Sequence, residues 1–175
     1  MISQTKQIAK ENPMRTIRLD RVVLSCGATG NDLEKAHKLL QLLTNRKPKR
    51  VTSTKRIPNF NVRPGLEVGV CVTLRGEEAS NSLKKLLGAI SNILNRKQIS
   101  PNHFSFGIHE YIEIPGIEYQ RDIGIRGLNI TVVFARAGTR VKRKKIKAGK
   151  IPEKQNIPQE EIISFMEENF STKFK

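Results

Sequence analysis

Residues 46–76 read RKPKRVTSTKRIPNFNVRPGLEVGVCVTLRG and join a cationic segment to a strand. In the second half of this stretch, apolar residues alternate with polar or small ones: Leu66, Val68, Val70, Val72 and Leu74 against Glu67, Gly69, Cys71, Thr73 and Arg75. A period of two residues is typical of a β-strand with one buried face. The stretch therefore predicts a rigid strand over 66–75 that holds a cationic arm.

The arm itself is a run of cations without acids. No Asp or Glu occurs between Thr44 and Leu66, and the run holds seven cations, Arg46, Lys47, Lys49, Arg50, Lys55, Arg56 and Arg63. Pro58 and Pro64 lack the backbone donor that regular structure needs, and asparagines favour turns. We expect a short strand over 51–54, an irregular exposed loop over 54–65, and a polyanion as the partner that offsets the repulsion.

Upstream of the arm, the pattern predicts a strand followed by a helix. Residues 15–26, RTIRLDRVVLSC, are rich in β-branched and apolar side chains and end at Gly27. The turn GATGND offers Asn31 or Asp32 as N-cap, and leucines then recur at helical spacing up to about Asn45.

Downstream of the arm, a second amphipathic helix is predicted from Glu77 to about Leu94, on the same side of the sheet as the first. Residues 95–103 are expected to be a linker, 104–113 a strand, 112–127 a long structured loop, and 128–137 the last strand. Pro158, with acids in the turn after it, predicts a short C-terminal helix.

A second cationic run lies between the last strand and that helix. No acid occurs between Arg136 and Ile151, and the run holds Arg136, Arg140, Lys142, Arg143, Lys144, Lys145, Lys147 and Lys150. Together the two runs carry fifteen of the 32 cations of the chain. An ordinary solvated surface rarely concentrates charge of one sign in this way, so both runs are candidate contacts for nucleic acid.

These elements predict an α+β fold: a mostly antiparallel sheet with two long helices packed on one face, an exposed basic loop, and a basic C-terminal extension with a short helix. The second face of the sheet would stay open and form a concave cationic surface with the two runs. We expect three parts: a flexible N-terminal extension over 1–12, the α+β domain over 13–138, and the basic extension over 139–175.

Composition narrows the class of partner. The 175 residues carry a formal net charge of +16, which implies a nucleic acid or an anionic membrane surface. Nucleic acid is favoured, since no apolar run approaches the ~18 residues that a membrane span needs and no helix pairs a broad apolar face with a basic one. The N-terminus lacks the apolar core of a secretory signal, so we expect a cytoplasmic protein with Cys26 and Cys71 reduced and largely buried.

The motifs of common enzymes are missing from the sequence. There is no phosphate-binding GxxxxGK[ST] motif, and His37, His103 and His109 are scattered without a second catalytic or metal-binding partner. We therefore predict no catalytic residue, no metal and no cofactor. Phe104 and Phe106 alternate as in an RNA-stacking sheet, but the Lys/Arg-Gly that opens that motif is missing, which favours core packing.

Three long segments carry a family resemblance: NPMRTIRLDRVVL, IPNFNVRPGLEVGVCVTLRG and FSFGIHEYIEIPGIEYQRDIGIRGLNITVVFARAG. They resemble the universal large-subunit ribosomal protein family that binds 5S rRNA, numbered five in bacteria and archaea and eleven in eukaryotes. The similarity covers residues 12–170. The run GTRVKRKKIKAGKIP and the closing helix are similar to the archaeal form.

The resemblance implies a domain in the central protuberance, with partners that include 5S rRNA, large-subunit rRNA, neighbouring ribosomal proteins, and the small subunit through an inter-subunit bridge. The 5S rRNA positions of the family fall on Ser25, Arg46, Phe60 and Thr73, where Ser25 replaces the usual Asn and Arg46 the usual Gln. Cations expected beside them are Lys47, Lys49, Arg50, Arg75, Arg140, Lys142, Arg143, Lys144 and Lys145. The loop expected to contact P-site tRNA includes Lys55, Arg56, Pro58, Asn59, Asn61 and Arg63.

Two other functions compete with this interpretation. One is a free-standing regulatory protein that binds nucleic acid, which the charge alone would equally support. The other is an RNA-processing enzyme that uses His103 or His109, which the scattered histidines make the weaker alternative.

Overall fold

The computed structural model describes residues 14–175, so the extension expected over 1–12 lies outside the described residues. Its centre is a six-stranded sheet in the order β2-β3-β1-β7-β6-β5, in which every neighbouring pair is antiparallel. The strands are β1 (Ile17–Gly27), β2 (Lys49–Thr52), β3 (Glu67–Leu74), β5 (Ile99–Ser100), β6 (His103–Ile108) and β7 (Leu128–Arg136). The predicted α+β class with a mostly antiparallel sheet is confirmed.

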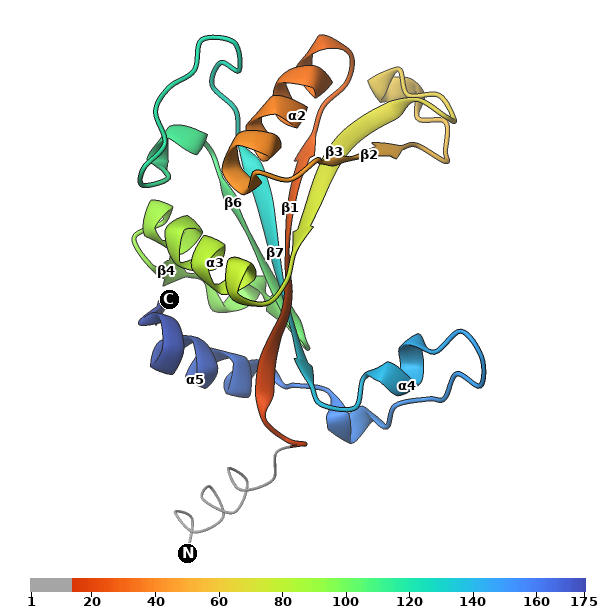
Figure 1. Ribbon diagram of the computed structural model, residues 1–175, viewed down its shortest axis with the longest axis vertical. Helices are drawn as coiled ribbons and strands as arrows, with labels where there is room; N and C mark the ends of the chain where they lie inside the picture. The colour runs from red at the N-terminus through yellow and green to blue at the C-terminus, as the bar shows by residue number, and fades with distance from the viewer. Residues whose placement is uncertain (1–13) are drawn as a thin grey trace, which may run out of the picture.

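Three helices cover one face of this sheet: α2 (Asn31–Thr44), α3 (Glu77–Ala89) and α5 (Gln159–Phe170) (Figure 1). One core joins them to the strands, and its fully buried members include Val22, Leu24, Leu39, Leu83, Phe134 and Met166. Each such apolar side chain contributes roughly 1.5–3 kcal/mol when fully buried. The two long helices occupy the predicted face, and the short C-terminal helix packs into the same core.

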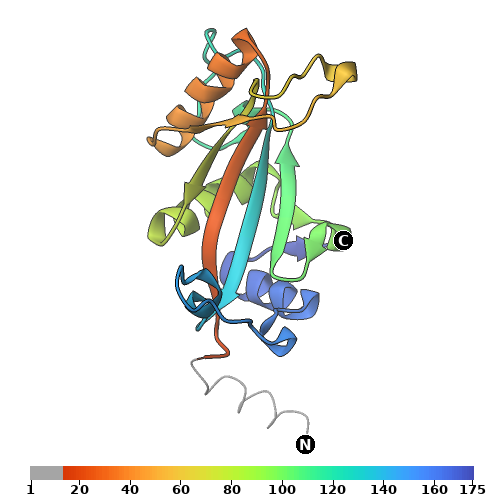
Figure 2. The same cartoon turned by 90° about the vertical axis from the view of Figure 1, so that its right-hand side faces the viewer.

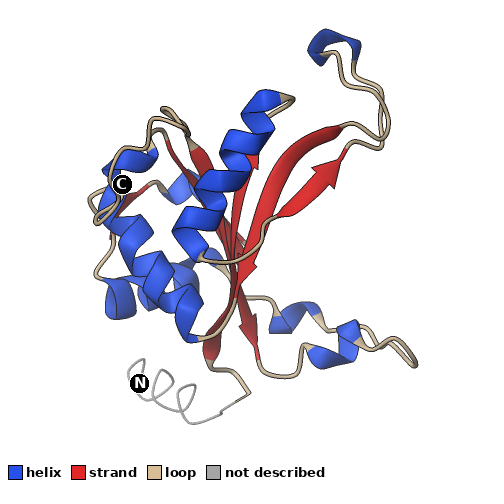
Figure 3. Cartoon of the chain, turned by 45° about the horizontal axis from the view of Figure 1, so that its top comes forward, coloured by secondary structure: helices blue, strands red, loops and turns tan. Residues whose placement is uncertain are grey.

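Among the described residues, no long helix packs on the opposite face of the sheet, which is flanked by two projecting arms (Figures 2 and 3). We call it the open face. The first arm is the hairpin that joins β2 to β3, with a 3-10 turn at Pro58–Phe60. The second arm is the basic extension over 138–156, which holds the one-turn helix α4 (Arg140–Arg143) and a 3-10 turn at Glu153–Gln155.

Strand β1 contains a bulge that the sequence analysis missed. Its register against β7 shifts between Leu19 and Arg21, so that Asp20 is the extra residue. Because of the shift, Leu19 and Val22 both pack on the core side, although three positions separate them. The broken alternation in RLDRVV is the sequence trace of this bulge.

The N-cap prediction for α2 was wrong. The residue that precedes the helix is Gly30, with φ 61° and ψ −134°, and Gly76 precedes α3 with φ 66° and ψ −143°. A positive φ with such a ψ is a conformation that favours glycine, so neither Asn31 nor Asp32 takes the cap position.

Two predicted elements were too long. Helix α3 ends at Ala89 rather than near Leu94, because Ser91 and Asn92 adopt positive φ values of 54° and 58°. Strand β6 ends at Ile108 rather than Glu113. A 3-10 turn at Tyr111–Glu113 follows it, and the buried Tyr111 hydroxyl accepts a hydrogen bond from the Gln120 backbone N–H at 2.9 Å.

The linker expected over 95–103 holds a 3-10 turn at Arg96–Gln98 and the short strand β5. Just before it, β4 (Ile93–Leu94) pairs in parallel with β8 (Lys173–Phe174), a pairing between distant segments that was not predicted. Within residues 14–175, no helix has both the length and the apolar character to cross a membrane.

Candidate nucleic-acid interface

The floor of the open face is built from small polar side chains. Strand register aligns Lys49, Cys71, Ser25, Asn129 and Gly107 in one row across five strands, and Thr73, Val23, Thr131 and Ser105 in the next. These residues alternate with the buried ones of each strand, so their side chains lie on the face away from the helices. The floor therefore offers hydroxyl and amide groups without a carboxylate in either row.

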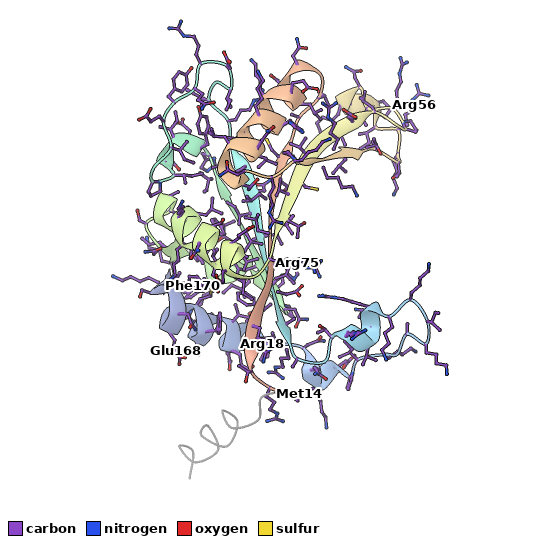
Figure 4. All side chains as sticks on the ribbon, viewed as in Figure 1. Met14, Arg18, Arg56, Arg75, Glu168 and Phe170 are labelled. Atoms are coloured by element: carbon purple, nitrogen blue, oxygen red, sulfur yellow. The ribbon has the colours of Figure 1, made fainter. Side chains whose placement is uncertain are left out.

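Cations gather at the two ends of this floor. The hairpin arm joins β3 where Gly69 faces Gly27, at the end of β1, and the extension leaves β7 where Arg136 faces Ile17, at its start. In Figure 4, Arg56 and Arg75 lie on the open side of the sheet, whereas Glu168 and Phe170 lie on the helix side. The arrangement can hold a polyanion across the sheet between two cationic arms.

The hairpin arm has a defined shape. Ile57 and Val62 exchange backbone hydrogen bonds of 2.9 and 3.1 Å, and the Gly65 N–H donates to the Ser53 carbonyl at 2.8 Å. The prediction of an exposed loop over 54–65 is confirmed, but the loop is not irregular throughout, since Ile57 and Val62 pair around a 3-10 turn. The pairing leaves Val62 buried and holds Phe60 out at the tip with 74% of its surface exposed.

Acids from outside the arm pair with two of its arginines. Arg46 Nη2 lies 2.6 Å from Glu78, and Arg50 contacts Glu34 at 2.7 Å and Glu67 at 2.9 Å. Hydrogen bonding by Glu67 and the nearby charge of Glu34 raise the pKa of Arg50. Arg46 and Arg50 are thus already partly neutralised within the chain, although the sequence around them is free of acids.

The basic extension is tied to the sheet through the bulge residue of β1. Asp20 Oδ2 accepts hydrogen bonds from Arg21 and Arg143, each at 2.8 Å. Burial raises the pKa of Asp20, but the hydrogen bonds and charges of Arg143 and Arg21 outweigh it, and the pKa ends below its ordinary value. The extension is therefore fixed against the open side by a charged contact.

With these pairs counted, most of the fifteen cations still have no carboxylate partner among residues 14–175. Four are in ion pairs: Arg46, Arg50, Arg143 and Arg136, which contacts Glu161. The difference, 15 − 4, leaves eleven: Lys47, Lys49, Lys55, Arg56, Arg63, Arg140, Lys142, Lys144, Lys145, Lys147 and Lys150. Their charge is available to a partner.

The structure brings some of the expected site residues together and separates others. Ser25, Thr73 and Lys49 share the open face, with Ser25 Oγ donating to the Asn129 carbonyl at 3.4 Å. Phe60 lies apart from them at the hairpin tip, beside the residues expected to contact tRNA: Lys55, Arg56, Pro58, Asn59, Asn61 and Arg63. Arg75 lies just past the end of β3, and Arg140, Lys142, Lys144 and Lys145 lie on or after α4.

Sequence reasoning missed part of the floor. Asn129 and Thr131 of β7, and His103 and Ser105 of β6, face the same side as Ser25. In the sequence, these polar residues alternate with apolar residues that are buried in the structure. That alternation could have placed them on the open face.

Phe104 and Phe106 form no stacking platform on this face. They are 1% and 5% exposed and stack on each other inside the core, with ring centroids 6.0 Å apart. Cys26 and Cys71 are both free thiols that project from opposite faces of neighbouring strands, and Cys26 is the buried one. Among residues 14–175, no three His, Cys, Asp or Glu side chains are grouped to hold a metal ion.

Two family models match the chain in succession. One is described as "Ribosomal protein L5" and matches residues 12–63, and the other describes the C-terminus of the same ribosomal family and matches residues 67–165. Together they cover the first arm, the sheet, α2, α3 and most of the basic extension.

Curated relatives extend the similarity over nearly the whole chain. A protein of Nanoarchaeum equitans named "Large ribosomal subunit protein uL5" is 42% identical over 161 residues, 90% of this chain and 95% of the relative. Proteins of the same name from Archaeoglobus fulgidus and Sulfolobus acidocaldarius are 39% and 38% identical, each over 95% of this chain and 94% and 95% of the relative. All three relatives are archaeal.

Proposed function

The chain belongs to the L5 family of large-subunit ribosomal proteins, and from this premise we propose that it binds 5S rRNA and large-subunit rRNA in the central protuberance. It is a structural constituent of the large ribosomal subunit rather than an enzyme. Like other ribosomal components, it is located in the cytoplasm. The RNA-processing alternative is thereby excluded.

The observation that carries the proposal is the division of the molecule into two sides. The core and the helices occupy one face of the sheet, and the open face has a polar floor between two cationic arms. Each cation that replaces a phosphate counterion would contribute about 0.7–0.9 to the slope of log affinity against log salt. Eleven cations without a carboxylate partner among residues 14–175 are enough for tight, salt-dependent binding.

We assign different contacts to the arms and the floor. Lysines and arginines of the arms would lie against phosphates, which positions the RNA without reading its sequence. The hydroxyls of Ser25 and Thr73 and the amide of Asn129 would bond ribose 2′-hydroxyls or phosphate oxygens, the groups that an RNA helix presents in its wide minor groove. In this proposal residues 13–138 form the rRNA-binding domain, and residues 139–175 add the second arm and the C-terminal helix α5 that packs on the core.

The tip of the hairpin arm is proposed to contact P-site tRNA. It projects beyond the sheet, ends in the exposed Phe60, and carries Arg56 and Arg63 on either side of its 3-10 turn. From family membership we also propose contacts with neighbouring proteins of the central protuberance and with the small subunit.

The test is co-purification followed by a salt titration. Tagged protein in growing cells should sediment with large subunits, and purified protein should retain 5S rRNA at low salt, with affinity falling steeply as potassium chloride rises. The alternative, a free-standing regulatory protein, predicts recovery away from ribosomes. Equal affinity for 5S rRNA and a DNA duplex of the same length, or an affinity indifferent to salt, would contradict the proposal.

A further inference from the structure

A pocket of about 900 Å³ lies where the basic extension meets the lower half of the open face. One wall comes from β1 and β7, through Arg21, Val133 and Ala135, and the other from the extension, through Lys142, Gly149 and Ile151. A volume of this size falls in the range of small-ligand sites, roughly 300–1,000 Å³. It exceeds what a single phosphate group would fill.

The pocket is strongly cationic. Five cations line it, Arg21, Arg136, Lys142, Arg143 and Lys150, and no carboxylate of the described residues does. Asp20 pairs with Arg21 and Arg143, and Glu161 pairs with Arg136, so the five positive charges meet two negative ones, 5 − 2 = +3. Lys142 and Lys150 have no carboxylate within ion-pair distance in the described chain. The surplus favours an anionic ligand.

One residue that lines the pocket, Arg136, has a buried donor without a partner among residues 14–175. The Arg136 side chain is 9% exposed; its terminal nitrogens contact Glu161 and the Lys154 carbonyl, but Nε makes no hydrogen bond. Leaving a buried donor unsatisfied costs about 1–3 kcal/mol, and more for a charged group. Arg136 is therefore a lining residue whose guanidinium keeps one unused donor.

The remaining lining suits a nucleobase. Val133, Ala135 and Ile151 supply apolar surface, and Gln155 and Asn156 lie beside them. The Gln155 amide nitrogen donates to the Ala137 carbonyl and the Asn156 amide oxygen accepts from Asn102, so the other polar atom of each amide is unused within residues 14–175. One acceptor and one donor are left for the edge of a base.

The walls are fixed before any ligand arrives. Asn102 bonds Asn156 at 3.1 Å and the Ile157 N–H at 2.8 Å, Arg143 bonds Asp20 at 2.8 Å, and the Gly149 N–H closes the tip of the extension onto the Val141 carbonyl at 3.1 Å. A preorganised pocket binds without the cost of ordering its loops.

We propose that this pocket receives one RNA nucleotide that is unstacked from its helix, with its phosphate on the side of Lys142 and Lys150 and its base against Val133, Ala135 and Ile151. The inference rests on the proposed RNA-binding function and adds to it a specific nucleotide position. Elsewhere on the open face the contacts would be with the RNA backbone, whereas here a single base would be enclosed.

The experiment separates insertion of a base from general attraction of charge. Ala148 lines the pocket and is exposed, so Ala148→Phe fills the space without changing net charge, and Ala148→Ser keeps it open. Filter binding to 5S rRNA and to large-subunit rRNA should show about a tenfold loss of affinity for Ala148→Phe on the RNA that supplies the nucleotide, with an unchanged salt slope. Ala148→Ser should stay within twofold of wild type. Equal affinities for all three proteins on both RNAs would overturn the inference.

A second measurement does not depend on the natural RNA. Amide NMR spectra of the full chain are recorded with each of the four ribonucleoside monophosphates and with inorganic phosphate at equal ionic strength. At least one nucleotide should shift Val133, Ala135 and Gly149 more than phosphate does, and Ala148→Phe should abolish the difference. If phosphate shifted these amide signals as much as every nucleotide did, the pocket would be a simple anion site and the proposal would be rejected. If nucleotides caused these shifts but the protein did not bind 5S rRNA, the nucleotide pocket would be supported and the proposed function would be rejected.

Discussion

Asp20 Oδ2 accepts a hydrogen bond of 2.8 Å from Arg143 Nη2, 123 positions further along the chain. The acceptor sits on the bulge of β1 and the donor at the end of α4, so one carboxylate joins the first strand to the basic extension. A cationic segment that would otherwise repel the other arm is thereby held at a fixed place beside the sheet.

Asp20→Asn should loosen this attachment. The loss of a charged hydrogen bond to a partly buried acceptor is expected to lower the free energy of unfolding by about 1.5–3 kcal/mol, measured by chemical denaturation at pH 7. Asp122→Asn is the matched control, because Asp122 is exposed and bonded to no charged group in the described structure. Equal stability of the two variants would mean that the contact does not hold the extension.

The same variant should change the response to acid. Since the pKa of Asp20 is lower in the folded chain than its ordinary value of 3.8, its contribution is fully present above that value and is lost as pH falls through the folded pKa. Unfolding curves recorded between pH 6 and about pH 2 should therefore converge for wild type and Asp20→Asn at the acid end. A constant difference across that range would contradict the assignment.

Removal of unpaired cations at the start of β2 should weaken RNA binding in a salt-dependent way. Lys47→Gln with Lys49→Gln is expected to reduce the slope of log affinity against log salt by about 1.4–1.8, at 0.7–0.9 for each lost phosphate contact. The control pair, Lys84→Gln with Lys85→Gln, changes the net charge equally on helix α3. A similar change in both proteins would show that net charge, not the open face, governs binding.

Phe60→Ala tests the exposed tip of the hairpin. With 74% of its surface exposed, the ring supports little of the fold, and the free energy of unfolding should change by less than about 0.5 kcal/mol. Binding to 5S rRNA should stay near wild type, whereas tRNA engagement by large subunits that carry the variant should weaken. A loss on 5S rRNA as large as the loss on tRNA would instead support the 5S rRNA role that the family resemblance implies for Phe60.

Thr73→Val replaces one hydroxyl of the floor by a methyl group. Thr73 is exposed in the middle of the open face, and its hydroxyl bonds no other described residue. The fold should keep its stability, and 5S rRNA affinity should fall by about 1 kcal/mol, roughly fivefold. An unchanged affinity in filter binding would remove Thr73 from the interface.

The two thiols, one on each face of the sheet, can show whether RNA covers the open face. Burial raises the pKa of Cys26, although Arg126 acts in the opposite direction, so its thiolate is scarce and its reaction with iodoacetamide should be slow in the folded protein. Cys71 is half-buried on the open face and should react faster. Bound 5S rRNA should protect Cys71, and mass spectrometry of Cys26→Ala and Cys71→Ala variants would distinguish the sites. Modification of Cys71 at the same rate with and without RNA would place the RNA elsewhere.

Local periodicity was enough to predict the strands of this sheet. The alternation over 66–75 and the run over 128–137 correspond to β3 and β7 within one residue at each end, because burial of one face forces a period of two. The helix face followed from the leucine spacing of α2 and α3, and Leu39 and Leu83 are fully buried there.

Features that depend on distant residues could not be obtained in this way. The end of α3 is followed by β4, which pairs with β8 some 80 positions later, and a window over 77–94 contains no trace of that partner. Likewise, the acid-free sequence around Arg50 gave no hint of Glu34, whose carboxylate reaches it from α2. Whether a cation is paired depends on which acids lie near it in the folded chain, so its neighbours in the sequence do not determine it.

Strand β1 runs between the two arms, with Gly27 at the hairpin and Ile17 at the extension. Its eleven residues are separated by ten steps of about 3.3 Å, so the strand holds the arms roughly 33 Å apart. A twisted sheet backed by three helices changes this span little, so an RNA that touches both ends must present its phosphates at a matching interval. In the proposed function, the protein would discriminate among folded RNAs by the spacing of their phosphates along this span, without contacts to the bases.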